Sequence, residues 1–375
     1  FLGFNVINTI IVAEGLDHLR GFDPVAVAAV LAVIGAGLAI FGHDRLHAAF
    51  KLLFWCNLPL VTVLTIAILA GRIAPTALPA PSAFTWAAFL AQFAAAASYN
   101  ITYAPYVSDY SRYLPPTVSR RAIIANVYVG ASASAIWLII LGAWLATRIA
   151  AKDSVGALAA AGDMLLPGFG TALALVSIGA LVATMGINAY SGMLTIVTGI
   201  DSIRPVVPTR RLRIILICLL AAIWFAIAAA FGGNAVGALG ATLIVMLYLL
   251  APWTSVNLVD YFLIRKGRYA IMDLARPDGL YAGWNRRGLM AYFAGLLASV
   301  PFFAIPGVWT GPAAAALGGA DIAWLTGLVV AALAYGAACR NFDADSEAQA
   351  IAASERERAI IDAGPGAMVG GGSAD

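Results

Sequence analysis

The stretch that decides the fold is SYNITYAPYVSDYSRYLPP, residues 98 to 116. It ends a long apolar run, yet it carries polar side chains such as Asn100 and Thr102, then Pro105, an acid and an arginine. A lipid-facing helix would not carry them, because in a bilayer a helix is interrupted only where protein or water satisfies the freed backbone groups. The pattern therefore predicts a discontinuous membrane helix over residues 99 to 105 whose polar groups face a ligand.

The composition indicates an all-α integral membrane protein. Hydrophobic residues make up 62% of the 375 residues and charged residues only 11%, well below the roughly 25% of charged residues in soluble domains. Runs of about 20 apolar residues are long enough to cross the hydrocarbon core as helices, and several runs here are too long for barrel strands. We expect about ten transmembrane helices, at residues 1 to 15, 24 to 42, 53 to 71, 85 to 104, 122 to 147, 169 to 199, 211 to 231, 235 to 264, 287 to 306 and 322 to 339.

The basic residues predict the orientation of these helices. If the first span runs outward, the cytoplasmic loops and the C-terminal end hold all 22 basic residues except Arg20, Arg72, Arg148 and Lys152. By the positive-inside rule, this places the C-terminus of a multi-pass protein of the cell membrane in the cytoplasm. The net charge of +3 then belongs to one membrane face and does not indicate a nucleic-acid partner.

Two domains are expected, a transmembrane domain over residues 1 to 340 and a cytoplasmic tail over residues 341 to 375. The tail is charged and alanine-rich and then glycine-rich, which predicts an amphipathic helix up to about Asp362 and partial disorder beyond it. At the other end, the helix from Asn5 to Leu16, at the membrane edge, is roughly 16 Å long, about half the hydrocarbon thickness, so Phe1 would start near the bilayer midplane. We therefore expect an upstream segment to be missing.

The reactive residue types argue against an enzyme. Cys56, Cys218 and Cys339 lie in or beside separate spans without metal-ligand spacing, and the three histidines lie in loops at the membrane edges. An intramembrane hydrolase or metalloenzyme would need a cluster of such side chains at membrane depth. We expect a non-enzymatic protein without a cofactor.

Four motifs carry a family resemblance: FGHDRLHAAFK, ITYAPYVSDYSRYLP, APWTSVNLVDYFLIRKGRY and PDGLYAGWNRRGLMAYFAG. Together they resemble the nucleobase:cation symporter-1 family, and within it the purine and cytosine permease branch, over residues 1 to 338. The resemblance implies a broken-helix carrier in which helices 1 to 5 and 6 to 10 form inverted repeats, a five-plus-five transporter fold. This chain would supply helices 3 to 12 of that pattern, with the first two missing.

The resemblance also implies a function. The protein would be a secondary active transporter that imports a nucleobase, purine or cytosine, or a related heterocycle. It would do so by cation symport through alternating access. Its partners would be the small-molecule nucleobase, the coupling cation and the lipid bilayer.

The resemblance assigns substrate-binding residues to three helices. The third helix of the family pattern offers an aromatic residue and, four residues later, an amide, which here are Phe1 and Asn5. The sixth supplies a second stacking group, at Asn100 without a gap or at Tyr99 with a one-residue shift. We favour Tyr99 for stacking and Asn100 for hydrogen bonding. The eighth helix supplies another amide, Asn188.

A coupling ion is implied as well. In sodium-dependent relatives, adjacent serine and threonine hydroxyls hold the ion together with backbone carbonyls. The matching positions here are Ala183 and Thr184, so one hydroxyl is absent. The ion is Na⁺ or H⁺, and because no carboxylate is expected at mid-depth, Na⁺ bound by Thr184 is the simpler hypothesis.

The residue types suit a nucleobase, a flat uncharged ring with donors and acceptors on its edge. Phe1 and Tyr99 can stack on such a ring, and the amides of Asn5, Asn100 and Asn188 can both donate to its edge and accept from it. Two alternatives stay open. The same fold could carry a hydantoin, a vitamin precursor or an amino acid, or the chain could be a truncated fragment that transports nothing.

Several polar residues have simpler structural roles. Thr102, Ser108 and Ser191 can serve as helix-packing residues. Asp109 and Arg112 have the spacing of a surface ion pair, and Asp260 next to Arg265 is interpreted as an interfacial anchor. Most tryptophans, Trp224 and Trp253 among them, fit packing or membrane-interface positions.

Overall fold

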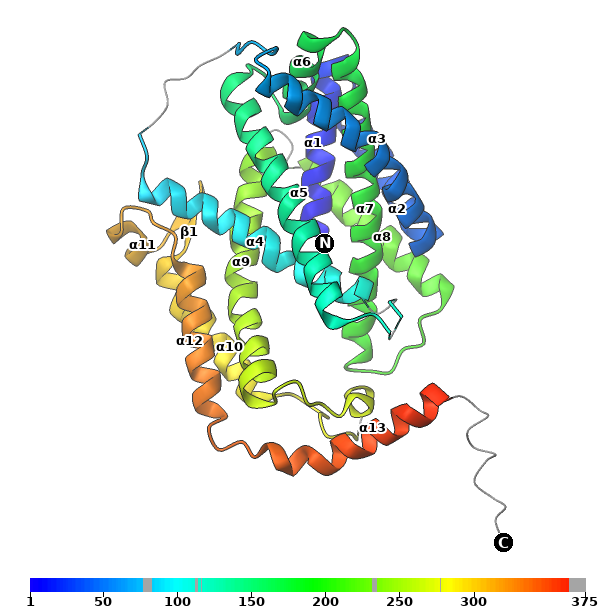
Figure 1. Ribbon diagram of the computed structural model, residues 1–375, viewed down its shortest axis with the longest axis vertical. Coiled ribbons are helices and arrows are strands. Elements are labelled where there is room, and N and C mark those ends of the chain that lie inside the picture. The colour runs from blue at the N-terminus through cyan, green and yellow to red at the C-terminus, as the bar shows by residue number, and fades with distance from the viewer. Residues whose placement is uncertain (77–82, 112–113, 116, 231–234, 277, 364–375) are drawn as a thin grey trace. The chain divides into compact units, whose positions relative to one another are not determined.

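The computed structural model describes residues 1–76, 83–111, 114–115, 117–230, 235–276 and 278–363 (Figure 1). Most of these residues are helical, as the composition predicts. One two-stranded antiparallel hairpin interrupts the helices, with β1 (Ala304–Ile305) paired to β2 (Trp309–Thr310). The chain divides into two compact units, described separately below. Unit 1 comprises Phe1–Ala83 and Ala104–Thr242, and unit 2 comprises Phe84–Tyr103 and Leu243–Asp375.

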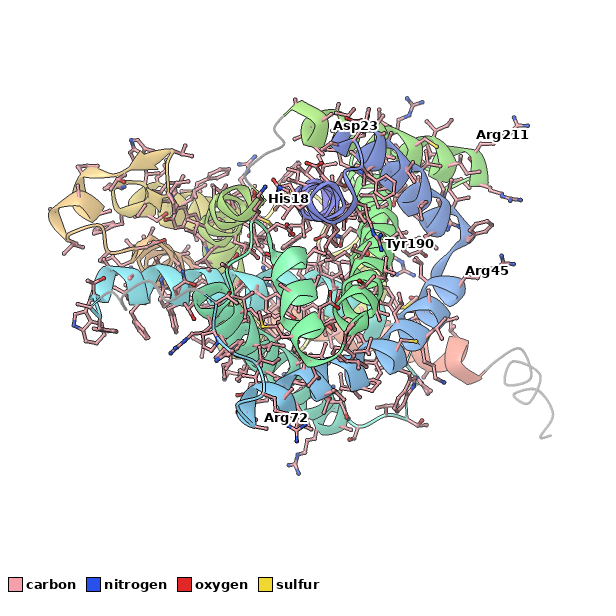
Figure 2. All side chains as sticks on the ribbon, turned by 90° about the horizontal axis from the view of Figure 1, so that it is seen from above. His18, Asp23, Arg45, Arg72, Tyr190 and Arg211 are labelled. Atoms are coloured by element: carbon pink, nitrogen blue, oxygen red, sulfur yellow. The ribbon has the colours of Figure 1, made fainter. Side chains whose placement is uncertain are left out.

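Unit 1 is a helical bundle in which α1 packs against α2, α6, α7 and α8. Trp224 of α8 is fully buried in its largest apolar cluster, among Val6, Ile10 and Met193, so its packing role is as predicted. The exposed arginines Arg45, Arg72 and Arg211 extend outward from the unit (Figure 2). The helices are α1 (Leu2–Arg20), α2 (Pro24–Phe41), α3 (His43–Leu69), α5 (Arg120–Arg148), α6 (Ser154–Leu165), α7 (Phe169–Asp201) and α8 (Arg210–Ala230).

Short-range signals in the sequence set the ends of these helices. Gly21 ends α1 with a left-handed φ of 69°, and Asp23 then caps α2 by accepting the Ala26 amide at 2.7 Å. Asp153 caps α6 in the same way through Gly156, at 2.9 Å. The sequence runs did not predict α6, which packs tightly on α7 because a Cβ on Gly170 would overlap the Ala159 carbonyl.

Unit 2 contains the C-terminal helices. α10 and α12 form its tightest pair, because a Cβ on Gly295 would lie 2.6 Å from the Gly327 carbonyl oxygen. The predicted span over residues 287 to 306 is shorter than expected, since α10 gives way to a 3₁₀ turn at Pro301 and then to the hairpin. The elements are α9 (Ala235–Val259, beginning in unit 1), η1 (Asp260–Ile264), η2 (Ile271–Ala275), α10 (Arg286–Ser299), η3 (Val300–Phe302), α11 (Pro312–Ala316), α12 (Ala323–Ala338), η4 (Ala344–Glu347) and α13 (Ala348–Ala363).

The predicted break over residues 99 to 105 is wrong. α4 (Trp86–Ser111) runs through it as one helix with Pro105 inside, and it passes from unit 2 to unit 1 between Tyr103 and Ala104. The polar side chains instead bond to carbonyls of their own helix. Asn100 donates to Ala96 at 2.9 Å, as serine, threonine and asparagine commonly do in helices.

Each of the ten predicted stretches contains a helix, and six helices of the described residues are long and apolar enough to cross a membrane. They are Pro24–Phe41, Arg45–Leu69, Arg120–Arg148, Phe169–Asp201, Arg210–Ala230 and Leu239–Ile264. The number of spans stays a prediction. In the tail, α13 extends to Ala363, whereas the predicted disorder and the Asp109–Arg112 pair fall outside the described residues and side chains.

Candidate functional site

Two asparagines predicted to read the substrate edge meet in unit 1. Asn188 of α7 donates from Nδ2 to Oδ1 of Asn5 on α1 across 2.9 Å. Both side chains are almost fully buried, with 2% and 1% of their surface exposed. Because burying an unpaired amide is costly, this contact accounts for two polar residues in an otherwise apolar helix interface.

The bond continues in both directions into a chain of hydrogen bonds. Asn5 donates from Nδ2 to the backbone carbonyl of Met185 at 3.1 Å, and Tyr106 donates from its hydroxyl to Oδ1 of Asn188 at 2.6 Å. The Met185 carbonyl can only accept, so Asn5 must turn its amino group toward it. Asn5 therefore offers its oxygen to Asn188, which in turn offers its own oxygen to Tyr106. One backbone carbonyl thus fixes the orientation of both amides and makes Tyr106 the donor.

The chain leaves part of each amide unused. An amide has two N–H donors and two acceptor lone pairs. In this series of hydrogen bonds, Asn5 and Asn188 each use one N–H donor and one acceptor lone pair. Each side chain therefore retains one N–H donor and one lone pair. A ligand that offers a neighbouring N–H and C=O or ring nitrogen matches that remaining pair.

Aromatic rings lie beside the asparagines. The Phe1 ring meets the Tyr106 ring edge to face, with centroids 4.8 Å apart and an interplanar angle of 73°. Phe1 also packs beside Gly192 of α7, where a Cβ would lie 3.5 Å from the Phe1 Cβ, an ordinary van der Waals contact. The structure therefore brings Phe1, Asn5 and Asn188 together, as predicted, and adds Tyr106. The sequence predicts no role of its own for Tyr106. The only signal is an aromatic residue directly after Pro105 in the motif YAPYVSD.

Thr184 lies one helical turn before Asn188 on α7, which puts the two on the same face. Its hydroxyl donates to the Ala180 carbonyl of its own helix at 2.9 Å, and its lone pairs stay available to a ligand. In the part of the chain that the structure describes, no group of three or more His, Cys, Asp or Glu side chains could hold a metal ion.

The other two predicted residues, Tyr99 and Asn100, belong to unit 2. Tyr99 stacks on Tyr103 with centroids 6.4 Å apart and an interplanar angle of 9°, and 38% of its surface is exposed. Asn100 is exposed and bonds back to Ala96. Within their own unit, both have surface available for a ligand.

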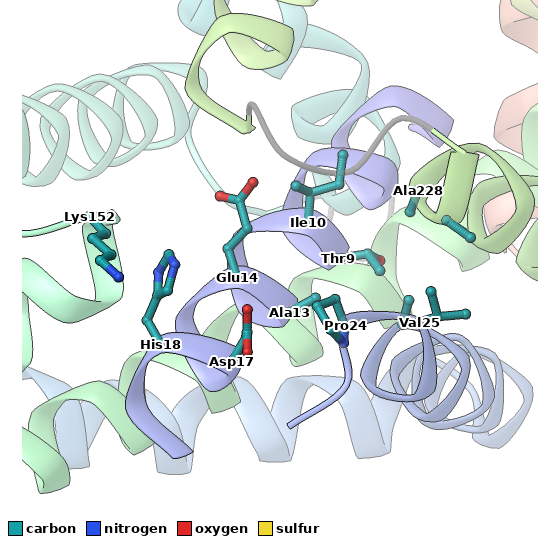
Figure 3. Close-up of a pocket in the computed structure, with 12 residues that line it drawn as sticks. Thr9, Ile10, Ala13, Glu14, Asp17, His18, Pro24, Val25, Lys152 and Ala228 are labelled. Carbon is teal, nitrogen blue, oxygen red and sulfur yellow. The ribbon is translucent and has the colours of Figure 1, made fainter. Parts of the chain in front are cut away.

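A cavity of about 390 Å³ lies beside α1 in unit 1 (Figure 3). Ionisable side chains line one side, namely Glu14, Asp17, His18 and Lys152, and apolar residues of α2 and α8 line the other. Thr9, one turn after Asn5 on α1, also lines the cavity, and its hydroxyl approaches the Met185 sulfur at 3.9 Å. His18 is tied to Asp153 across 2.7 Å. The sequence did not predict this cavity.

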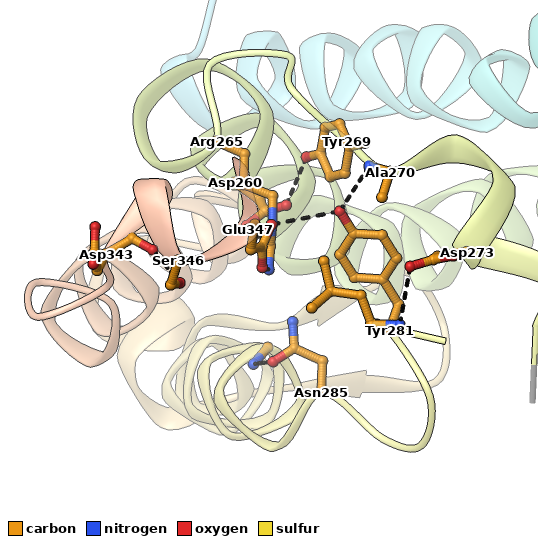
Figure 4. A network of polar contacts seen from close by, with 12 residues as sticks. Asp260, Arg265, Tyr269, Ala270, Asp273, Tyr281, Asn285, Asp343, Ser346 and Glu347 are labelled. Atoms are coloured by element: carbon orange, nitrogen blue, oxygen red, sulfur yellow. Dashed lines mark hydrogen bonds and ion pairs between the residues drawn. The ribbon is translucent and has the colours of Figure 1, made fainter. Parts of the chain in front are cut away.

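A second polar cluster lies in unit 2 at the end of α9 (Figure 4). Arg265 contacts Asp260 at 2.6 Å, as the predicted anchor requires, and it also binds both oxygens of Glu347, at 2.9 and 3.1 Å. The hydrogen bonds with Glu347 raise the pKa of Arg265. Tyr269 donates to the other oxygen of Asp260 at 2.6 Å. We call Asp260, Arg265, Tyr269 and Glu347 the C-terminal clamp, because Glu347 leads directly into α13.

Unit 2 also buries a carboxylate that the sequence did not predict. Asp321, just before α12, is 1% exposed and accepts the Tyr248 hydroxyl at 2.8 Å and the Ala323 amide at 3.2 Å. Desolvation raises the pKa of Asp321. The Tyr248 hydroxyl in turn accepts the Ala304 amide at 2.9 Å, so this group fastens the hairpin to the start of α12.

Comparisons with known proteins agree with this architecture. The profile of the family described as permeases for cytosine/purines, uracil, thiamine and allantoin matches residues 1–327. The chain is 31% identical over 343 residues to YxlA of Bacillus subtilis strain 168, named as a purine-cytosine permease, covering 89% of this chain and 72% of that protein.

A solved structure is similar as well. Mhp1, a nucleobase-cation-symport-1 family transporter in a closed conformation with bromovinylhydantoin bound, aligns with a TM-score of 0.55. The alignment covers 92% of this chain and 76% of Mhp1 at 19% identity. This likeness confirms the predicted all-α transporter fold.

Proposed function

Because the chain belongs to the nucleobase:cation symporter-1 family, whose profile describes permeases for cytosine/purines, uracil, thiamine and allantoin, we propose that it imports a nucleobase. The protein is a multi-pass membrane transporter and not an enzyme. The proposed substrate is a purine or cytosine, or a related heterocycle, and the proposed mechanism is cation symport by alternating access. The positive-inside pattern supports a cytoplasmic C-terminus.

The observation that carries this proposal is the buried Asn5–Asn188 pair. The pair holds two amides in a fixed orientation beside aromatic rings. This arrangement suits a nucleobase, because its edge alternates N–H donors with carbonyl or ring-nitrogen acceptors and its faces stack on aromatic rings. The remaining donor and lone pair of each asparagine suit that edge.

In unit 1, we propose that Phe1 supplies a stacking face and that Asn5 and Asn188 bind the ring edge. In unit 2, Tyr99 and Asn100 keep their predicted roles in stacking and hydrogen bonding. Phe1 supports this role because its ring lies beside the hydrogen-bonded chain. Tyr99 supports it because its ring is partly exposed and parallel to a neighbouring aromatic ring.

For the coupling ion, we propose Na⁺, with Thr184 as a ligand together with backbone carbonyls. The position of Thr184 one turn from Asn188 would couple ion and substrate through one helix. The alternative is a proton, which would make uptake depend on the pH gradient instead of the sodium gradient.

A hydantoin is the second candidate substrate. Mhp1 was solved with bromovinylhydantoin, and a hydantoin ring offers the same alternation of N–H and C=O groups on a flat ring. Vitamin precursors and amino acids are further alternatives. An amino acid would require a partner for its carboxylate, such as a helix N-terminus, in addition to the amides.

Uptake assays test the proposal. Cells that lack their own nucleobase permeases and express the protein should accumulate at least one radiolabelled base among cytosine, adenine, guanine, hypoxanthine and uracil. Asn188→Ala should reduce that uptake at least about 10-fold, because the base loses its amide partner. Asn126→Ala is the matched control, since Asn126 is exposed on α5 and bonds only to its own helix among the contacts described. Uptake of a hydantoin but no nucleobase would contradict the proposed substrate.

A further inference from the structure

Resting on the proposed function, we propose that Tyr106 is a positioning residue that stands in for the substrate. Its hydroxyl donates to the Asn188 side-chain oxygen in this structure, and an N–H of the incoming base takes over that hydrogen bond. Tyr106 thereby sets the affinity for the base and drives its release.

The first step of the argument is the direction of the bond. The Met185 carbonyl fixes both asparagines so that Tyr106 can only donate to Asn188. The 2.6 Å separation lies at the short end of the range for O–H donors. Tyr106 therefore presents to Asn188 the same group, a polarised X–H donor, that the edge of a nucleobase would present.

The second step is occlusion. Asn188 and Asn5 are 2% and 1% exposed, so a ligand cannot reach the amides while the site keeps this arrangement. The Phe1 and Tyr106 rings pack against each other beside Asn188. The remaining donor and lone pair of Asn188 are buried with the rest of its side chain, so in this proposal the base reaches them only by displacing the Tyr106 ring, its hydroxyl or both.

The third step is the attachment of Tyr106. It directly follows Pro105, which has no N–H and cannot donate to the carbonyl one turn earlier. Only the residues from Tyr106 to Ser111 of α4 follow the proline. One backbone hydrogen bond of α4 is therefore missing next to Tyr106. This lowers the energy needed to move Tyr106.

The exchange has a defined consequence for affinity. When the base binds, one hydrogen bond to Asn188 breaks and another forms, so the hydroxyl competes directly with the substrate. Removing the hydroxyl leaves the Asn188 oxygen unpaired in the free protein, and the base then gains a bond without breaking one. The affinity should rise about 5- to 10-fold, the effect of one ordinary hydrogen bond. Release should slow because the competitor is gone.

The experiment uses the purified protein and the base that the uptake assay identifies. Tyr106→Phe keeps the ring and its contact with Phe1 but removes the hydroxyl. We expect its dissociation constant for the base and its KM for uptake to fall about 5- to 10-fold, while maximal uptake stays equal or decreases. Tyr128→Phe is the control, because Tyr128 is an exposed tyrosine of α5.

Each other outcome is informative. An unchanged dissociation constant in Tyr106→Phe would show that the hydroxyl only packs. A raised constant would show that Tyr106 donates to the substrate itself, and either result overturns the inference while leaving the proposed function intact. If the wild-type protein binds none of the bases, the proposed function fails and this inference fails with it.

A spectroscopic readout separates a substrate-linked role from a structural one. With 3-fluorotyrosine incorporated, the resonance that is missing in Tyr106→Phe identifies Tyr106. It should shift when the base saturates the protein. A resonance that stays in place at saturation would contradict displacement of the hydroxyl.

Discussion

Asn188 and Asn5 lie 183 residues apart in the chain, yet their side-chain amides bond directly at 2.9 Å. The contact fastens α7 to α1 in the interior of unit 1, and it makes each amide the partner that satisfies the other. The pair therefore affects stability as well as substrate recognition, and the two effects can be measured separately.

Asn5→Ala and Asn188→Ala should not have additive effects on stability. Each single variant leaves a buried polar atom of the other asparagine unpaired, which costs about 1–3 kcal/mol. The double variant removes both atoms, so its loss should be smaller than the sum of the two by about 1 kcal/mol or more. Thermal unfolding in detergent measures this. A loss equal to the sum would mean that the bond does not form in the protein.

Thr184→Val should raise the sodium concentration needed for half-maximal uptake by about 10-fold, because the variant keeps the shape of the side chain but loses a hard oxygen ligand. The control lies on the same helix. Thr195 also donates to the carbonyl four residues earlier, at 2.9 Å, so Thr195→Val removes an equivalent hydroxyl away from the proposed ion. Uptake that is independent of the sodium concentration and depends on the pH gradient would disprove the sodium proposal.

Arg265→Gln should weaken the attachment of α13 to the rest of unit 2. The guanidinium of Arg265 holds Asp260 and Glu347, and the three side chains are mostly buried, so removing it leaves two carboxylates without their cation. We expect a loss of about 3 kcal/mol in stability. Trypsin should also cut faster after Arg356 and Arg358. Arg268→Gln, which changes an exposed arginine nearby, should leave both measurements unchanged.

The C-terminal clamp should also weaken at alkaline pH. Desolvation and the hydrogen bond to Asp260 raise the pKa of Tyr269 above its ordinary value of 10.0. A raised pKa in the folded state means that Tyr269 contributes its full stabilisation below pH 10 and loses it as the pH rises through the folded-state pKa. The difference in melting temperature between wild type and Tyr269→Phe should therefore be largest near pH 8 and shrink above pH 10. A difference that does not change with pH would contradict this assignment.

Two glycines of unit 2 should respond oppositely to alanine. A Cβ at Gly295 would lie 2.6 Å from the Gly327 carbonyl oxygen and 2.8 Å from the Ala331 Cβ, so Gly295→Ala should destabilise the α10–α12 pair by about 1–3 kcal/mol. A Cβ at Gly336 on α12 meets nothing within 4 Å, and Gly336→Ala should stabilise the helix by up to about 1 kcal/mol. Thermal unfolding of the two variants checks both signs.

The helical class and the helix positions could be predicted from the sequence because each apolar run is a local signal. The family resemblance placed Asn5 and Asn188 at one site, and the structure brings them into contact. Tyr106 could not be predicted, since its role depends on the direction that a distant backbone carbonyl, that of Met185, imposes on two amides. Asp260 and Arg265 lie five residues apart and were paired from the sequence, whereas Glu347 lies 82 residues from Arg265 and was not.

The predicted break in α4 shows what the residue types of a segment cannot predict. Polar residues in an apolar run can face a ligand, or they can bond to their own helix, and the sequence does not distinguish the two. In the structure, Asn100, Thr102 and Ser108 each donate to a carbonyl three or four residues earlier, so the helix continues. Buried Asp321 was missed for a related reason, because its partners Tyr248 and Ala323 are assembled only by packing.

The division of α4 between the two units has a consequence for how the protein is made. The first part of α4 belongs to unit 2, but the rest of that unit begins only at Leu243, about 140 residues after Tyr103. At the synthesis rates typical of cells, roughly 10 seconds separate the emergence of the two parts from the ribosome. During that interval the segment from Trp86 to Tyr103 has no partners from its own unit. We therefore expect the insertion machinery or the surrounding lipid to cover this part of α4 until α9 to α12 have been synthesised.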